Sequence, residues 1–188
     1  MRAIIVFGAA ALALAGCQSP EEKRAAETGQ IEVANASADE VSRLMRAAQP
    51  KLAMKPGEWR FELRVLSAET GAGPLAEGDA KLASLRQQER TIVGCRAEKD
   101  LKPIDLEQLE KVAGECTFPR YSLARGKLEA QIECEQPSGA ATRMTARGTT
   151  SSDGFAVTLD QRSGTPGAED YVALKLQARG RRLGECRG

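Results

Sequence analysis

The chain has 188 residues with 27 basic and 26 acidic side chains, so it is close to neutral at pH 7. A neutral chain has no long-range field that attracts nucleic acid, and we exclude nucleic acid as a partner. The sequence contains no histidine. This absence excludes catalysis by a histidine-activated serine or cysteine and argues against a zinc site, so no metal or cofactor is expected.

The first 17 residues have the pattern of a bacterial lipoprotein export signal. Arg2 supplies the positive charge, and residues 3–13 form an apolar run that is too short for a permanent membrane helix, which needs about 20 residues. The small-residue stretch 14–16 then leads to Cys17. We therefore predict cleavage after residue 16 and lipidation of Cys17. The alternative is an ordinary secretory signal with a cysteine at this position by chance.

Lipidation would anchor the mature chain in a membrane of the cell envelope. Residues 1–16 contain only Arg2 among charged residues, so their removal leaves 26 basic and 26 acidic side chains. Gln18 follows the lipidated position, where an aspartate tends to hold enteric lipoproteins at the inner membrane. We therefore expect a periplasm-facing lipoprotein, at the outer membrane rather than the inner one.

The rest of the chain divides into three parts. Residues 17–36 are small, charged and poor in bulky apolar groups, and we interpret them as the lipidated cysteine and a flexible tether with a reach of about 25 Å. Residues 37–54 are predicted to form an amphipathic helix and a connection. Residues 55–188 are predicted to form one β-rich, disulfide-bonded domain.

The amphipathic helix is predicted over 38–48. Ser37 and Glu40 have the spacing of a capping box, and Pro50 closes the segment. We expect the helix to fold back onto the face of its own domain that carries Trp59; the alternative is a helix that binds a partner. Four apolar side chains follow one another at helical spacing: Val41, Leu44, Met45 and Ala48.

From residue 56 the apolar period becomes that of a β-strand, because every second residue from 59 to 65 is apolar. The fold class is therefore mainly β (α+β): a strongly bent antiparallel meander sheet or open barrel of about seven strands with one or two short helices. A long connection with one helical turn in 81–88 is expected over 67–88, and a short helix is expected over 105–113. The strands are predicted over 56–65, 90–95, 116–122, 127–135, 141–149, 154–161 and 170–179.

Four cysteines remain in the mature chain, and an even number in an oxidising compartment predicts two disulfides. If the loop that joins the strands of Cys116 and Cys134 has three residues, the numbers of opposing residues sum to 250. The two cysteines satisfy this sum, which leaves Cys95 to pair with Cys186. Pro119 cannot donate to the strand ladder, so a bulge or an edge is expected there.

Short motifs also resemble a known family. They are Pro56-Gly57-Glu58-Trp59 at the start of the domain, Cys95 before a short helix, the Cys116–Cys134 hairpin and the ending 180–186. Together they are similar to the proteobacterial family catalogued as domain of unknown function 3617, over about residues 56–186. The resemblance implies an exported, β-rich, disulfide-bonded envelope protein and no catalytic residues.

Few side chains are candidates for a binding site. Arg179, Arg181 and Arg182 form the densest basic cluster, which is either a solvated turn or a site for an anionic envelope component such as a phosphorylated lipid. Trp59 is either a core anchor or a ligand platform. The carboxylates near Asp105 are expected on a solvated helix face.

We therefore predict a non-enzymatic, lipid-anchored periplasmic domain that binds a ligand or supports the envelope. A bent antiparallel sheet leaves a groove between its walls, so the first candidate function is binding of an apolar or lipid-like ligand in that groove. A protein-interaction module of the envelope, using the helix over 38–48 or a sheet edge, is the second. A histidine-free hydrolase that uses carboxylates is the third, and no catalytic residue is assigned.

Overall fold

The computed structural model describes residues 18–97, 101, 111, 113–135, 139 and 141–186. The helices are α1 (Pro20–Thr28), α2 (Ala38–Leu52) and α3 (Ala80–Arg86). The strands are β1 (Ile31–Ser37), β2 (Gly57–Thr70), β3 (Gly73–Pro74), β4 (Arg90–Arg96), β5 (Glu115–Ala124), β6 (Lys127–Glu135), β7 (Ala141–Ser151), β8 (Gly154–Ser163) and β9 (Val172–Gly184). All seven predicted strands are present, and β1 and β3 are additional.

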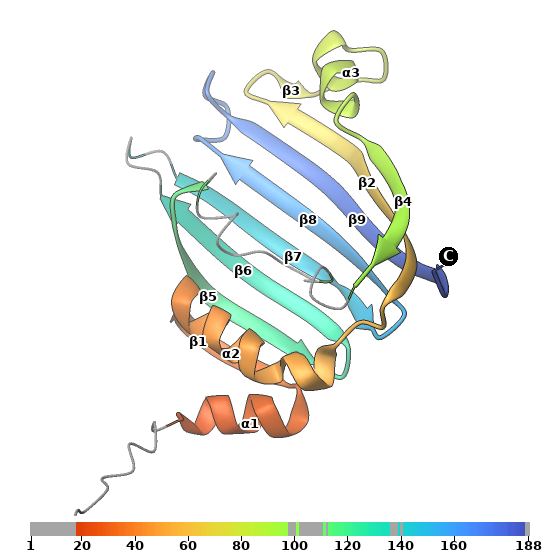
Figure 1. The fold of residues 1–188 in the computed structure, drawn as a ribbon. Helices are drawn as coiled ribbons and strands as arrows, with labels where there is room; N and C mark the ends of the chain where they lie inside the picture. The colour runs from red at the N-terminus through yellow and green to blue at the C-terminus, as the bar shows by residue number, and fades with distance from the viewer. Residues whose placement is uncertain are drawn as a thin grey trace, which may run out of the picture.

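These strands form one antiparallel sheet that is strongly curved and open (Figure 1). Their order in the described residues is β1-β5-β6-β7-β8-β9-β2, with β3 and β4 both paired to β2. The strands from β5 to β9 follow one another as a meander, whereas β2 pairs with β9 across more than 100 residues of sequence. The predicted fold class is confirmed.

The tether predicted over 18–36 is wrong, because these residues form α1 and β1. The Ser19 hydroxyl accepts from the Glu22 N–H at 3.1 Å, and the Glu22 carboxylate accepts from the Ser19 N–H at 3.2 Å, which caps α1. α1 packs on α2, and β1 pairs with β5. The segment has few apolar side chains, but Ala25 and Ile31 are both buried by these tertiary contacts.

α2 confirms the predicted amphipathic helix and extends it to Leu52. The Ser37 hydroxyl accepts from the Glu40 N–H at 3.2 Å, whereas Pro50 lies inside the last turn and does not close the helix. The helix packs on its own domain and on the face of the sheet that carries Trp59, as predicted, but over β1 and β5 rather than over β2. The reason is local: β1 ends at Ser37 and continues directly into α2, which keeps the helix at this edge of the sheet.

The helical turn predicted within the connection 67–88 is present as part of α3, and the segment also contains strand structure. β2 continues to Thr70 through an irregularity between Val65 and Ser67, and α3 follows with Asp79 as its cap. The helix predicted over 105–113 lies outside the described residues except for two helical positions, Lys111 and Ala113.

Both predicted disulfides are present. Cys116 and Cys134 lie directly opposite each other on β5 and β6, with their Cα atoms 4.1 Å apart. Cys95 on β4 is bonded to Cys186 beyond the end of β9, with a Cα separation of 5.6 Å. The first bond is buried in the core, and the second is exposed at the edge of the sheet.

The loop between β5 and β6 has two residues, not the three assumed from the sequence. Ala124 pairs with Lys127, and Arg125 and Gly126 both have positive φ (52° and 73°), as a type I′ turn requires. Residue numbers of opposing pairs therefore sum to 251 beside the turn. The predicted irregularity at Pro119 shifts the register by one, which restores the sum of 250 at the cysteine pair.

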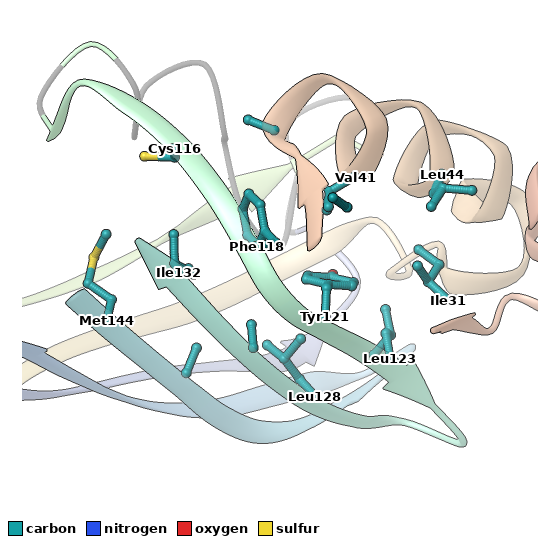
Figure 2. Close-up of a cluster of buried hydrophobic side chains, with 14 of the residues drawn as sticks. Ile31, Val41, Leu44, Cys116, Phe118, Tyr121, Leu123, Leu128, Ile132 and Met144 are labelled. Atoms are coloured by element: carbon teal, nitrogen blue, oxygen red, sulfur yellow. The ribbon is translucent and has the colours of Figure 1, made fainter. Parts of the chain in front are cut away.

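The main core lies between α2 and one face of β1, β5, β6 and β7, and we call this face of the sheet the inner face and the opposite one the outer face. Within the core, the rings of Phe118 and Tyr121 meet edge to face at a centroid distance of 5.9 Å. Figure 2 shows how the helix and the sheet contribute to this cluster: Ile31, Val41, Leu44, Cys116, Phe118, Tyr121, Leu123, Leu128, Ile132 and Met144.

Candidate functional site

The inner face of β8, β9 and β2 carries apolar side chains that are only half buried. Alternate residues of a strand point to the same side, so the strand register joins them into one continuous surface. By contrast, the inner-face residues of β5 and β6 are buried. We call the half-buried set the apolar inner surface: Phe61, Leu63, Phe155, Val157, Leu159, Leu174 and Leu176.

Three other parts of the chain cover the inner face around this surface. α2 covers β1 and β5, as described above. Leu101 packs against Met54 and Trp59 near the start of β2. At the other end, Leu82 of α3 packs against Val65 and Ala68. Among the described residues, the apolar inner surface therefore lies between three covered regions.

A row of aromatic rings forms one end of this surface. Trp59 and Phe61 stack at a centroid distance of 5.8 Å with an angle of 15° between the ring planes, and Phe61 lies 6.2 Å from Phe155. Gly180 on β9 lies opposite both phenylalanines, and a Cβ atom at this position would collide with the Phe155 ring. The ring of Phe155 therefore lies over the backbone of β9, in space that only glycine leaves free.

One cation lies beside the aromatic row. The Arg96 guanidinium lies 5.7 Å from the centroid of the Phe61 ring, within the range of a cation–π contact. Arg96 also lines an open hollow of about 580 Å³ next to the exposed disulfide, together with Pro56, Gly57, Cys95, Ala97, Glu185 and Cys186. The arrangement places a positive charge at the end of an apolar surface, which is suited to a molecule with an apolar body and an anionic end.

A second, smaller space connects the apolar inner surface with the core. It has a volume of about 30 Å³, enough for one or two water molecules. Phe155 and Val157 line it from the sheet, and Met45 and Leu52 line it from α2. This space is too small for a ligand, but it shows that α2 meets the apolar inner surface along its side.

The structure separates the residues that the sequence grouped as binding candidates. Trp59 is fully buried, and its indole Nε1–H donates to the Lys55 carbonyl at 2.9 Å, so it is a core side chain. Arg182 donates from Nε to the Pro56 carbonyl at 2.8 Å and pairs with Glu185. Arg179 and Arg181 are exposed on the outer face. Cys17 lies outside the described residues.

Two exposed carboxylates have pKa values below the ordinary range. The pKa of Asp153 is lowered by hydrogen bonds from Ser152 and Lys55, and the pKa of Glu77 is lowered by Arg86. A general acid needs the opposite shift, caused by burial or by a neighbouring negative charge. Within the described residues there is also no group of histidine, cysteine and acidic side chains that could hold a metal ion.

Sequence reasoning missed Phe155, Gly180 and Arg96 as residues of one site. The alternation of apolar residues over 154–161 predicts the strand correctly, but it does not say which strand lies beside it. Phe61 meets Phe155 only because β2 pairs with β9 and β9 pairs with β8. The pairing of β2 with β9 is the non-local step that assembles the surface.

These features define a small disulfide-bonded domain built on one open, curved antiparallel sheet with an apolar inner surface. The chain belongs to the family of proteins of unknown function DUF3617, whose family model matches residues 54–186. Comparisons with curated proteins and with solved structures give no match. The match to the family model begins after α2. The three elements α1, β1 and α2 therefore lie outside the matched region, although their side chains form part of the main core. No helix of the described residues is long and apolar enough to cross a membrane.

Proposed function

We propose that this protein is a non-enzymatic, lipid-anchored protein of the cell envelope that binds an apolar, lipid-like ligand on its inner face. The observation that carries the proposal is the apolar inner surface, whose seven side chains stay half buried within the fold. Fully burying an exposed side chain of this kind contributes about 1.5–3 kcal/mol, and a half-buried one gains only a fraction of that value, so an occupant must cover several of them to gain a useful binding energy.

The dimensions and chemistry of the surface define the ligand class. From Phe155 to Leu159 the surface extends about 13 Å along β8, and from β8 to β2 it is about 10 Å wide. Arg96 lies at the aromatic end, and no acidic residue is among the seven side chains of the surface. The ligand that fits is an amphiphile with an acyl-like body and an anionic head near Arg96.

The proposed anchor is an acylated Cys17 at the periplasmic side of a membrane, the outer membrane rather than the inner one. Only Gln18 separates Cys17 from Ser19, which caps α1. Two residues of extended chain span at most about 7 Å. The domain would therefore be held close to the membrane surface and not suspended on the long tether that the sequence predicted.

Ligand binding can be tested with the mature chain, residues 17–188, in which Cys17→Ser prevents acylation. Fluorescence titration with cis-parinaric acid, a fluorescent fatty acid, should show saturable binding. Val157→Asp should weaken this binding roughly tenfold or more, because it places an unpaired charge in the apolar contact. Ala156→Asp is the matched control, since Ala156 is the neighbouring residue on the outer face of the same strand.

Equal loss in both variants, or no binding by the parent protein, would contradict the proposal. Because Val157→Asp can also disturb folding, Val157→Ser provides a milder variant, and thermal melting should show that it is folded. Native mass spectrometry of the protein purified from its own envelope then reports which ligand it retains.

The anchor is tested separately. Cys17→Ser should move the exported protein from the detergent phase to the aqueous phase in Triton X-114 partitioning. Partitioning that is the same for the variant and the parent would rule out acylation of Cys17 as the anchor.

One observation favours a protein-interaction module as a second candidate. β4 is an edge strand, with β2 as its one partner among the described strands, and its Ile92 and Val93 are 41% and 49% exposed. Such an edge can accept a further strand. Arg90 and Arg96 at its two ends would meet each other in an antiparallel pair of copies, which favours a partner strand with acidic ends over self-association. Cross-linking from Val93→Cys would distinguish a second copy from another envelope protein.

A further inference from the structure

The outer face carries a group of basic side chains that the sequence does not reveal as one group. Arg179 and Arg181 alternate with inner-face residues of β9, and Arg60 on β2 lies directly opposite Arg181. On the other side, Arg147 on β7 and Lys127 on β6 point to the same face, where Glu129 lies directly opposite Arg147. We call the five basic residues the basic outer surface. All five are exposed, and none takes part in an ion pair between described residues.

Small side chains form the floor between these cations. The register places Ala156 opposite Arg179, Gly154 opposite Arg181, and Thr149 between Ala156 and Lys127. Three strand spacings separate β9 from β6, which is about 14 Å. The hollow beside the exposed disulfide and the small space beside α2 both lie elsewhere. A broad floor of small side chains with cations on both sides fits an extended anionic surface better than a small enclosed ligand.

The pairing of Arg60 with Arg181 is unfavourable for the fold itself. Two like charges directly opposite each other on neighbouring strands are destabilising. Glu62 lies opposite Arg179 on the adjacent outer-face row, so it is not the direct partner of either arginine in this pair. A fold optimised for stability alone would replace one arginine of the pair, and an external anion relieves the repulsion.

We propose that the basic outer surface binds the anionic phosphate headgroups of a phospholipid membrane. Each basic side chain near such a membrane contributes about 1 kcal/mol, and phosphate oxygens accept the forked hydrogen bonds that arginine donates. This surface lies on the face of the sheet opposite the apolar inner surface. Binding of a membrane here is therefore independent of the ligand proposed above.

The test is co-sedimentation of the Cys17→Ser mature chain with vesicles of phosphatidylcholine alone and with vesicles in which a third of the lipid is phosphatidylglycerol. We expect binding to the anionic vesicles only, with a loss of affinity as salt is raised. The double variant Arg179→Glu and Arg181→Glu should reduce the affinity roughly tenfold or more.

Arg162→Glu is the matched control, because Arg162 is an exposed arginine on the same face of the sheet, six residues or about 20 Å along β8 from Ala156. It should keep most of the vesicle affinity. Equal loss in both variants would show general charge attraction and overturn the proposed site. Displacement from the vesicles by millimolar inorganic phosphate at constant ionic strength would identify free phosphate as the ligand and overturn the membrane version.

A second measurement separates a binding role from a structural one. Arg181→Gln removes the like-charge pair, so it should leave the melting temperature unchanged or raise it while it weakens vesicle binding. A variant that binds anionic vesicles like the parent would overturn the proposal, whatever its stability. A fall in both stability and binding would assign Arg181 to the fold and also count against the site.

Discussion

Gly180 of β9 lies directly beneath the ring of Phe155 on β8. This contact joins a strand from the meander to the row of aromatic rings that begins with Trp59 on β2. It depends on the absence of a side chain at residue 180, because a Cβ atom there would overlap three atoms of the ring. The position of Phe155 on the inner face is therefore sensitive to a single methyl group.

Gly180→Ala should displace the Phe155 ring and lower stability by about 1–3 kcal/mol, the usual cost of an added group in a packed site. Gly94→Ala is the control. Gly94 faces the same side from β4, and a Cβ atom there meets no atom within 4 Å. Since alanine suits a strand better than glycine, the control should be neutral or slightly more stable. Urea unfolding of both variants measures the difference, and equal stabilities would contradict this packing.

Leu44→Ala should destabilise the protein by about 2–5 kcal/mol, because Leu44 is 2% exposed and belongs to the main core. Arg46→Ala, an exposed position of the same helix, should change stability little. Leu44→Asp should lower the melting temperature further, since it forces an unpaired charge into the core. Unchanged melting of the Leu44 variants would mean that α2 does not pack on the sheet.

The two disulfides should differ in their response to a reducing agent. Cys116 and Cys134 are 5% and 2% exposed, whereas Cys95 and Cys186 are both exposed. Reduction requires access of a thiolate to a sulfur atom, so Cys95–Cys186 should be reduced first. Alkylation followed by mass spectrometry at increasing times of reduction gives the order. Loss of this bond releases a loop of 91 residues, which costs about 4–5 kcal/mol of stability in the chain-entropy model.

The part of the chain that matches the family model should not fold stably alone. Of the 17 buried residues in the main cluster, seven precede residue 54, from Ala25 to Ala48. Their removal would expose the inner face around Phe118 and Tyr121 to water. We expect residues 54–188 to be degraded rapidly in limited proteolysis under conditions in which residues 18–188 resist. Equal resistance would place α1, β1 and α2 outside the folding unit.

Alkaline pH should destabilise the protein through Tyr121. Burial raises the pKa of its phenol above the ordinary value of about 10, so the folded state holds the proton more tightly than the unfolded state. The stabilising effect is present below pH 10 and is lost as the pH rises towards the folded pKa. Urea unfolding between pH 8 and about 11.5 measures this fall, and Tyr121→Phe should show a shallower one. If stability falls with pH equally in the parent protein and in Tyr121→Phe, the fall is not caused by Tyr121.

Local patterns in the sequence were enough for most of the individual elements. The alternation of apolar residues located the seven predicted strands, and the Ser37-to-Glu40 spacing located the start of α2, because both signals act between residues a few positions apart. The cysteine pairing was also predicted, although through a loop one residue too long. The extra residue and the shift at Pro119 cancel, so the correct pair followed from an incorrect turn.

The tertiary structure alone decided the partners of these elements. Residues 18–36 contain a capping box at Ser19 and Glu22, but they have few apolar side chains, and α2 and β5 provide the surfaces that bury Ala25 and Ile31. The apolar inner surface and the basic outer surface both depend on β2 pairing with β9, a contact between residues more than 100 positions apart. Side-chain periodicity determines which residues share a face of a strand, but the neighbour of that strand is selected by the packing of the whole sheet.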